Sequence, residues 1–382
     1  MRKVVIGLAV FFAAVAAVAE LPALRQSERS PAVPFLTFYP SAAPRTPGVA
    51  PLNTQVWSVA RPISQLRLAL LSTPNNGSET FLHILQIGQP FPPSVAAVKT
   101  LPEPAIRAAT LPDGSVLVIA DTDPGPDRSF ASSLFRLAPG APTVLLANHV
   151  VWASRPLVTP DGRVFIARGS TGPPVPRGIR VDSLLIDEVN PQSGSTRTVW
   201  SDNGYVAFLA GSFANNLILY NIGPSGARVL LVNEDTGREK VILPSLPAGN
   251  SFSVSRSGDL VFVDADSSKT HWVVERLNLI SGKLDQLHES VSSQLIPYEW
   301  PQGGITLNDP ARPVEGPLAT SASGRRDLID IQAVTADGSF AVAFAEGSSS
   351  LPGVVLLDPL GTEVTQVQTP ENLPITVAGF VR

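Results

Sequence analysis

Hydrophobic positions along this chain occur in short alternating runs that stop at a proline, a glycine or an Asp-Gly pair. The clearest example spans residues 157–167, LVTPDGRVFIA, where one apolar run ends at Pro160 and another begins after Gly162. Alternation with a period of two predicts half-buried β-strands, and Asp-Gly predicts a tight hairpin turn with positive φ angles. Because the pattern returns at residues 109–120, 254–263 and 334–344, it predicts a series of β-hairpins.

The hairpins recur at a nearly constant interval. A single hairpin cannot bury its own apolar face, so a repeated hairpin indicates an array of units that share a core. The interval is about 45 residues, which is the period of propeller blades. The seven marks of the turn are Gln65–Leu66, Gly114, Gly162, Asn215–Asn216, Gly258, Gly303–Gly304 and Gly338.

Each unit contains further strands after its hairpin. Residues 183–200 and 228–243, for example, each hold two apolar segments separated by an Asn, Asp or Gly turn. Four short antiparallel strands per unit are typical of a β-propeller. We therefore predict one all-β domain over residues 54–382, a single β-propeller with seven four-stranded blades. Six or eight blades fit the same pattern, because residues 308–326 make a poor unit. The last apolar segment, 374–381, is predicted to join the first blade, which removes two exposed sheet edges.

The first 53 residues differ from the rest. In residues 1–19, Arg2 and Lys3 precede an apolar segment that ends in an Ala-Val-Ala cleavage site, which is the pattern of a signal peptide. The apolar segment is about fifteen residues long, short for a membrane span of roughly 20. We therefore expect a periplasmic or secreted protein with no membrane span after signal cleavage; an uncleaved anchor is the alternative. Residues 20–53, rich in Pro, Ala and Ser, are predicted to form a linker or arm.

Composition narrows the choice of partners. The formal net charge of −4 gives no support to binding of nucleic acid or of an anionic membrane. The chain has no cysteine, so it can form neither a disulfide nor a lipid-modified N-terminal cysteine. We expect a monomer that binds a protein or an envelope polymer.

The repeated phrase resembles a known repeat. TolB-like and related exported bacterial β-propellers carry W-S-P-D-G-x-x-L-A-F in their inner hairpins. The phrase here is similar at Leu111–Gly114 and Thr159–Gly162, and more loosely at Trp300–Gly304. The resemblance covers residues 54–382 and implies a propeller fold and an envelope setting. TolB has an α/β domain before its propeller, for which the roughly thirty residues available here are too few. Without a G-x-S-x-G nucleophile elbow, a prolyl-peptidase activity is not expected.

One face of such a propeller is predicted to carry the binding site. If the Pro-Asp-Gly turns lie on one face, the loops between second and third strands lie on the other, together with the connectors between blades. Two of these loops, residues 121–132 and 168–182, are unusually long, and connector 148–155 is expected beside them. Long loops in compact domains are commonly functional. The candidate ligand-binding residues there are His149, Arg155, Arg168 and Arg177, and Tyr298 and Glu299 are added as candidates facing the central channel.

A calcium site is the one metal site that the sequence suggests. Asp121, Asp123 and Asp127 surround Gly125 in a bend, and Ca²⁺ binds several converging oxygens. The pattern lacks the later carboxylates of an EF-hand, so a plain Asp-rich turn is the alternative. No cofactor is expected otherwise, since the four histidines have no metal-ligand spacing.

Together these features predict an exported, non-catalytic β-propeller that binds a protein or envelope component through its loop-rich face. No catalytic residues are assigned. One alternative is a propeller enzyme of the lactonase, lyase or glycosidase type, with its site at the channel mouth, because such sites collect residues from several blades. A calcium-stabilised structural module is the other alternative.

Overall fold

Strands make up almost all of the secondary structure of this protein. A 3₁₀ turn at Ile63–Gln65 is the one helical element in the described part of the chain, so the prediction of an all-β protein is confirmed. Consequently, no helix in the described part of the chain could cross a membrane. The computed structural model describes residues 46–47, 63–73, 79–88, 99–122, 132–151, 154–171, 181–246, 248–265, 270–293, 295–301, 303–309, 311, 329–335, 337–345, 353–359, 363–367 and 373–381.

The strands form six sheets in which neighbours along the chain are neighbours in space. The first sheet runs β27 (Ile375–Val381), β2 (Arg67–Ser72), β3 (Thr80–Gln86) and β4 (Lys99–Leu101). The largest contains β5 (Ala105–Thr110), β6 (Val116–Asp121), β7 (Ser132–Leu137), β8 (Val144–Val150), β10 (Val164–Thr171), β11 (Val181–Val189) and β12 (Thr196–Asp202), with β9 (Leu157–Val158) on β10.

The remaining sheets follow in chain order. One is β13 (Val206–Phe213), β14 (Asn216–Gly223), β15 (Gly226–Asn233) and β16 (Glu239–Leu243). The next is β17 (Asn250–Val254), β18 (Asp259–Ala265), β19 (Trp272–Asn278) and β20 (Leu284–Ser290), with β1 (Thr46–Pro47) added in parallel to β20. The last two are β21 (Ile296–Glu299) with β22 (Ile305–Asn308), and β23 (Ile329–Val334), β24 (Ala341–Ala345), β25 (Gly353–Leu357) and β26 (Glu363–Val367).

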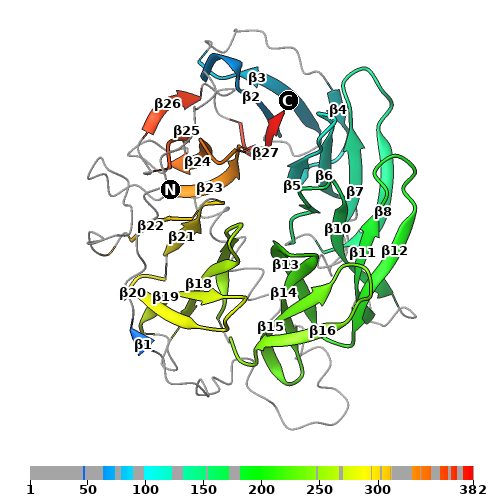
Figure 1. Ribbon diagram of the computed structural model, residues 1–382. Helices are drawn as coiled ribbons and strands as arrows, with labels where there is room; N and C mark the ends of the chain where they lie inside the picture. Colours follow the sequence, from blue (N-terminus) through cyan, green and yellow to red (C-terminus); the bar gives the residue numbers. More distant parts are fainter. Residues whose placement is uncertain are drawn as a thin grey trace.

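The sheets are arranged around a common centre in a propeller-like ring (Figure 1). The ring closes through contacts between strands, in the order β27–β5, β5–β9, β10–β13, β13–β17, β17–β21, β21–β23 and β23–β27, of which β5–β9 lies within the largest sheet. The predicted closure by the C-terminal segment is confirmed, because β27 pairs antiparallel with β2 from the start of the ring. This pairing covers one edge of each of the two strands and joins the end of the ring to its start.

The repeated phrase forms the turn between the first two strands of a sheet. At Leu111–Ser115, the Gly114 amide donates to the Leu111 carbonyl at 2.9 Å, and the Leu111 amide donates to the Ser115 carbonyl at 2.8 Å. Equivalent bonds close the turns that begin at Thr159, Ser255, Trp300 and Thr335.

The backbone of this turn corrects one sequence expectation. Among the residues of the Leu111–Ser115 turn, only Gly114 has positive φ, at 80°, so the Asp-Gly pair does not adopt positive φ at both residues. The turn is a type I turn followed by a glycine in the left-handed region, a G1 bulge. Asp113 instead caps the turn, since its Oδ1 accepts from the Ser115 amide at 2.9 Å and the Ser115 hydroxyl at 2.6 Å.

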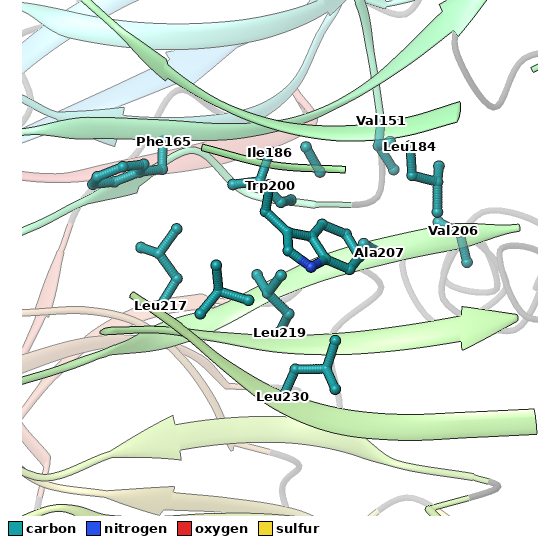
Figure 2. Close-up of a cluster of buried hydrophobic side chains, with 12 residues drawn as sticks. Val151, Phe165, Leu184, Ile186, Trp200, Val206, Ala207, Leu217, Leu219 and Leu230 are labelled. Carbon is teal, nitrogen blue, oxygen red and sulfur yellow. The ribbon is translucent and has the colours of Figure 1, made fainter. Parts of the chain in front are cut away.

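The hydrophobic core lies between neighbouring sheets. Figure 2 shows Trp200 of β12 lying between side chains of its own sheet, such as Ile186, and side chains of the next sheet, such as Leu219. Trp200 is 5% exposed, and its Nε1 donates to a Glu239 carboxylate oxygen at 2.7 Å, so burial of the ring leaves no unpaired donor. Alternation along each strand therefore places one apolar face against each neighbouring sheet, as propeller packing requires.

Candidate functional site

Five polar side chains from different parts of the chain meet at the centre of the ring, and we call them the central cluster. Arg107 is the third residue of β5, Arg155 lies two residues before β9, and Tyr298 is the third residue of β21. Asp330 and Gln332 are the second and fourth residues of β23. Four of the five therefore lie within β5, β21 and β23, and Arg155 lies just before β9.

A contact between Arg155 and Gln332 defines this centre. The Arg155 Nη1 donates to the Gln332 backbone carbonyl at 3.0 Å, and its Nη2 donates to the Gln332 side-chain oxygen. Around the ring, β9 and β23 are separated by β5 and β27 on one side and by β13, β17 and β21 on the other. The Arg155 side chain must therefore reach across the centre of the ring to meet its partner.

The charges of the central cluster influence one another. The pKa of Arg107 is lowered to about 10, mainly by burial and also by the nearby positive charge of Arg155, whereas Asp330 acts in the opposite direction. Burial raises the pKa of Asp330, and both arginines act against that shift. The Asp330 side chain is still exposed to solvent, so the surrounding protein raises its pKa without excluding water from the carboxyl group. Burial also raises the pKa of Tyr298 to about 12.

The central cluster contains two of the residues that the sequence pointed to, Arg155 and Tyr298. It also contains three that sequence reasoning missed, Arg107, Asp330 and Gln332. A signal for them exists: each interrupts an apolar first strand, in AIRAAT and in IDIQAV. That signal becomes readable only when these segments are known to be the strands nearest the centre.

Arg168 has a structural partner. Its Nε donates to the Asp187 carboxylate on the neighbouring strand β11 at 2.7 Å, and Thr198 donates to the other oxygen of Asp187 at 2.8 Å. Asp187 is fully buried, and a buried carboxylate needs such partners. Arg168 therefore satisfies a charge inside its sheet in addition to any role in binding.

His149 and Glu299 lie apart from the central cluster. His149 is exposed near the end of β8 and has a φ of 58°, an unfavourable conformation for a residue other than glycine. Glu299 follows Tyr298 and points to the opposite side of the strand, where it is 1% exposed against β17. Its backbone amide donates to the Ser253 hydroxyl at 2.7 Å.

Glu299 is a buried carboxyl group in an unusual electrostatic position. Burial raises its pKa to about 8, Asp259 adds to the rise, and Arg276 opposes it. In the described part of the chain, one of its oxygens, Oε2, is buried and has no hydrogen-bond partner. With a pKa of about 8, Glu299 is mostly protonated at neutral pH.

The suggested calcium residues are only partly described. Asp121 ends β6 and pairs with Ser132 of β7, and its Oδ1 is buried without a hydrogen-bond partner. Asp123, Asp127 and Arg177 lie outside the described residues. Within the described ranges, no three His, Cys, Asp or Glu side chains are grouped so that they could hold a metal ion.

Comparison with known proteins identifies no family for this chain. The sequence matches no protein family and no curated protein. Among solved structures, it is similar to TolB from Acinetobacter baumannii, with 10% identity and a TM-score of 0.48 over 83% of this chain and 68% of that one.

Two other similar structures have different roles. The nidogen/laminin complex matches with 14% identity and a TM-score of 0.43, covering 83% of this chain and 97% of that one. An oligogalacturonate lyase in complex with manganese matches with 11% identity and a TM-score of 0.43, covering 78% and 74% of the two chains. Similarity at this level assigns neither a family nor a function to this chain.

Proposed function

We propose that this protein is an exported, non-catalytic β-propeller that binds a protein or another envelope component through the face on which its first strands begin. The observation that carries this proposal is the central cluster, in which side chains from four separate segments meet at the centre of the ring. Binding sites on propellers are built from such convergent groups because the sheets supply a rigid frame.

The proposal includes a ring of seven blades. The largest sheet is joined through one residue pair, Arg168 with Val150, and divides there into β5–β8 and β9–β12. This division turns the six sheets into seven units, if β21–β22 is counted as an incomplete blade. The contacts that close the ring link these seven units one after another. The region expected to complete the sixth unit, within residues 308–326, lies mostly outside the described residues.

Export is the part of the proposal that depends on residues 1–19. Their charged start, apolar segment and Ala-Val-Ala site match a signal peptide. A cysteine-free sequence is compatible with an oxidising compartment, because it has no thiol to form a wrong disulfide. We propose a periplasmic or secreted monomer in which residues 20–53 act as an arm.

The chemistry of four of the five side chains in the central cluster, all except the Asp330 carboxyl, favours binding over catalysis. Guanidinium groups remain protonated at neutral pH and cannot act as bases. Tyr298, with its pKa raised to about 12, loses its proton less readily than an ordinary phenol. These groups are suited to hold a ligand by charge and hydrogen bonds.

Crosslinking in the native envelope, followed by capture of the tagged full-length protein, tests the proposal. We expect a specific partner that is lost when the loop at residues 121–132 is shortened. The matched control is Arg238→Gln, on the β15–β16 turn. That turn lies with the hairpin turns on the opposite face, since the Glu234 amide donates to the Asn215 carbonyl at 3.0 Å. Recovery of the protein alone would contradict the proposal, and a lactonase, lyase and glycosidase screen would then test the enzyme alternative.

A further inference from the structure

Most arginines in the described strands of this protein are paired with carboxylates. The closest pairs include Arg197 with Glu188 at 2.6 Å and Arg168 with Asp187 at 2.7 Å. Six described arginines have a carboxylate oxygen within 4.0 Å: Arg136, Arg163, Arg168, Arg197, Arg228 and Arg276. Pairing compensates for the partial loss of water around these charges.

The two arginines of the central cluster are different. Within the described residues, neither Arg107 nor Arg155 forms an ion pair. The Arg107 Nη1 donates to the backbone carbonyl of Ile106 at 3.0 Å, and Arg155 donates to Gln332. The two positive charges are close enough for Arg155 to lower the pKa of Arg107. With Asp330 as the one carboxylate of the cluster, the cluster has an excess of positive charge.

Two like charges close together repel each other, and the single carboxylate of Asp330 can neutralise only one of them, so a further anion would be favourable here. A guanidinium has five N–H donors in a planar fork that matches the two oxygens of a carboxylate. Arg107 uses one of these donors in its bond to Ile106, so most of its fork remains available. Arg155 is exposed and bound to an uncharged amide, and an anion would be a stronger acceptor than that amide.

We propose that Arg107 and Arg155 together bind a side-chain carboxylate of an acidic peptide segment at the centre of the ring, and that Arg155 leaves Gln332 to do so. This inference rests on the proposed function and specifies the chemistry of its partner. Asp330 favours a peptide over a polyanion such as an acidic polysaccharide or a phosphate polymer. A regularly charged polymer would place a further negative charge against Asp330, whereas a peptide can offer it a backbone N–H.

The test is calorimetric titration of the full-length protein with a tetraglutamate peptide and, for comparison, a tetraglutamine peptide. We expect tetraglutamate alone to bind, and its affinity to fall as salt is added. Arg107→Gln and Arg155→Gln should each weaken binding about tenfold or more, since each removes charge-assisted hydrogen bonds. Arg155→Lys should also weaken binding, because it keeps the charge and removes the fork.

Arg238→Gln is the matched control, as it removes an exposed arginine from the opposite face and should leave binding unchanged. Thermal unfolding of each variant separates lost binding from lost folding. Because Arg155 is exposed, we expect its variants to keep the fold more readily than the Arg107 variant.

Three results would overturn the inference: no binding of tetraglutamate, equal binding of tetraglutamine, or binding that survives both arginine-to-glutamine changes. Tighter binding of tetragalacturonate, lost in the same variants, would also overturn it in favour of a polysaccharide. If tetraglutamate fails while envelope capture still yields a partner lost on shortening the 121–132 loop, only this inference falls and the proposed function stands.

Discussion

Replacing Glu299 with Gln should change how the stability of this protein depends on pH. Glu299 is 1% exposed, its Oε2 has no hydrogen-bond partner, and its pKa is raised to about 8 by burial and by Asp259. Arg276 is the one positive group that opposes this rise. In the unfolded chain, the pKa of the same carboxyl group is near its ordinary value of 4.5.

The sign of the effect follows from proton binding. Between pH 4.5 and about 8, the folded protein keeps the Glu299 proton, whereas the unfolded chain has released it. Because the folded state binds more protons, the free energy of unfolding falls as pH rises through this window. Each pH unit corresponds to about 1.4 kcal/mol, so the full window corresponds to about 5 kcal/mol as an upper limit. Gln carries no titrating proton and removes this contribution.

The assay is urea unfolding of the wild-type protein and Glu299→Gln at pH 5, 6, 7 and 8. We expect the stability difference to shift steadily in favour of the variant as pH rises, by about 3 kcal/mol over this range. An amide in place of the protonated carboxyl can lower stability by the same amount at every pH. The test therefore depends on how the stability difference between the two proteins changes with pH. Parallel pH profiles for the two proteins would refute the reasoning.

Two further predictions concern the turns and the buried charges. Gly114→Ala should lower stability by about 1–2 kcal/mol through its φ of 80° alone, since nothing lies within 4 Å of the added Cβ. Gly258→Ala should lower it more, because its Cβ would also lie 2.5 Å from the Phe213 ring; equal urea midpoints would contradict this difference. Asp187→Asn, which leaves Arg168 partly solvated, should cost about 2–3 kcal/mol, and Arg168→Ala, which leaves the buried carboxylate unpaired, should cost more. The opposite order in chemical denaturation would show that the pair is not held as described.

The all-β fold was predicted from patterns of residues that are close together in the sequence. Alternating apolar runs predicted strands, and Pro-Asp-Gly phrases predicted the turns between them, because both depend on residues that are close in sequence. The prediction was wrong in one detail, since a G1 bulge places only glycine, and not the preceding Asp, in the left-handed region. The C-terminal strand was also predicted correctly, because a ring that begins without a first strand needs one from its other end.

Local pattern does not show which partner an arginine has. Arg168 was predicted to bind a ligand because it begins a long loop, and that stays a prediction; what the structure adds is its contact with the buried Asp187 on β11. Conversely, Arg107 was not identified, because a single charge within an apolar strand has no meaning until its neighbours across the sheet are known. Such partners are set by pairing register, which local pattern leaves open.

The sequence by itself thus determined the strands, the turns and the closure of the ring, all of which follow from the alternation and the backbone preferences of neighbouring residues. Only the tertiary structure decided which side chains meet at the centre. Arg155 and Gln332 are 177 residues apart, and their contact exists because the ring brings opposite sheets together across its centre. The charges of the central cluster are coupled for the same reason, since electrostatic interactions depend on distance in space and not along the chain.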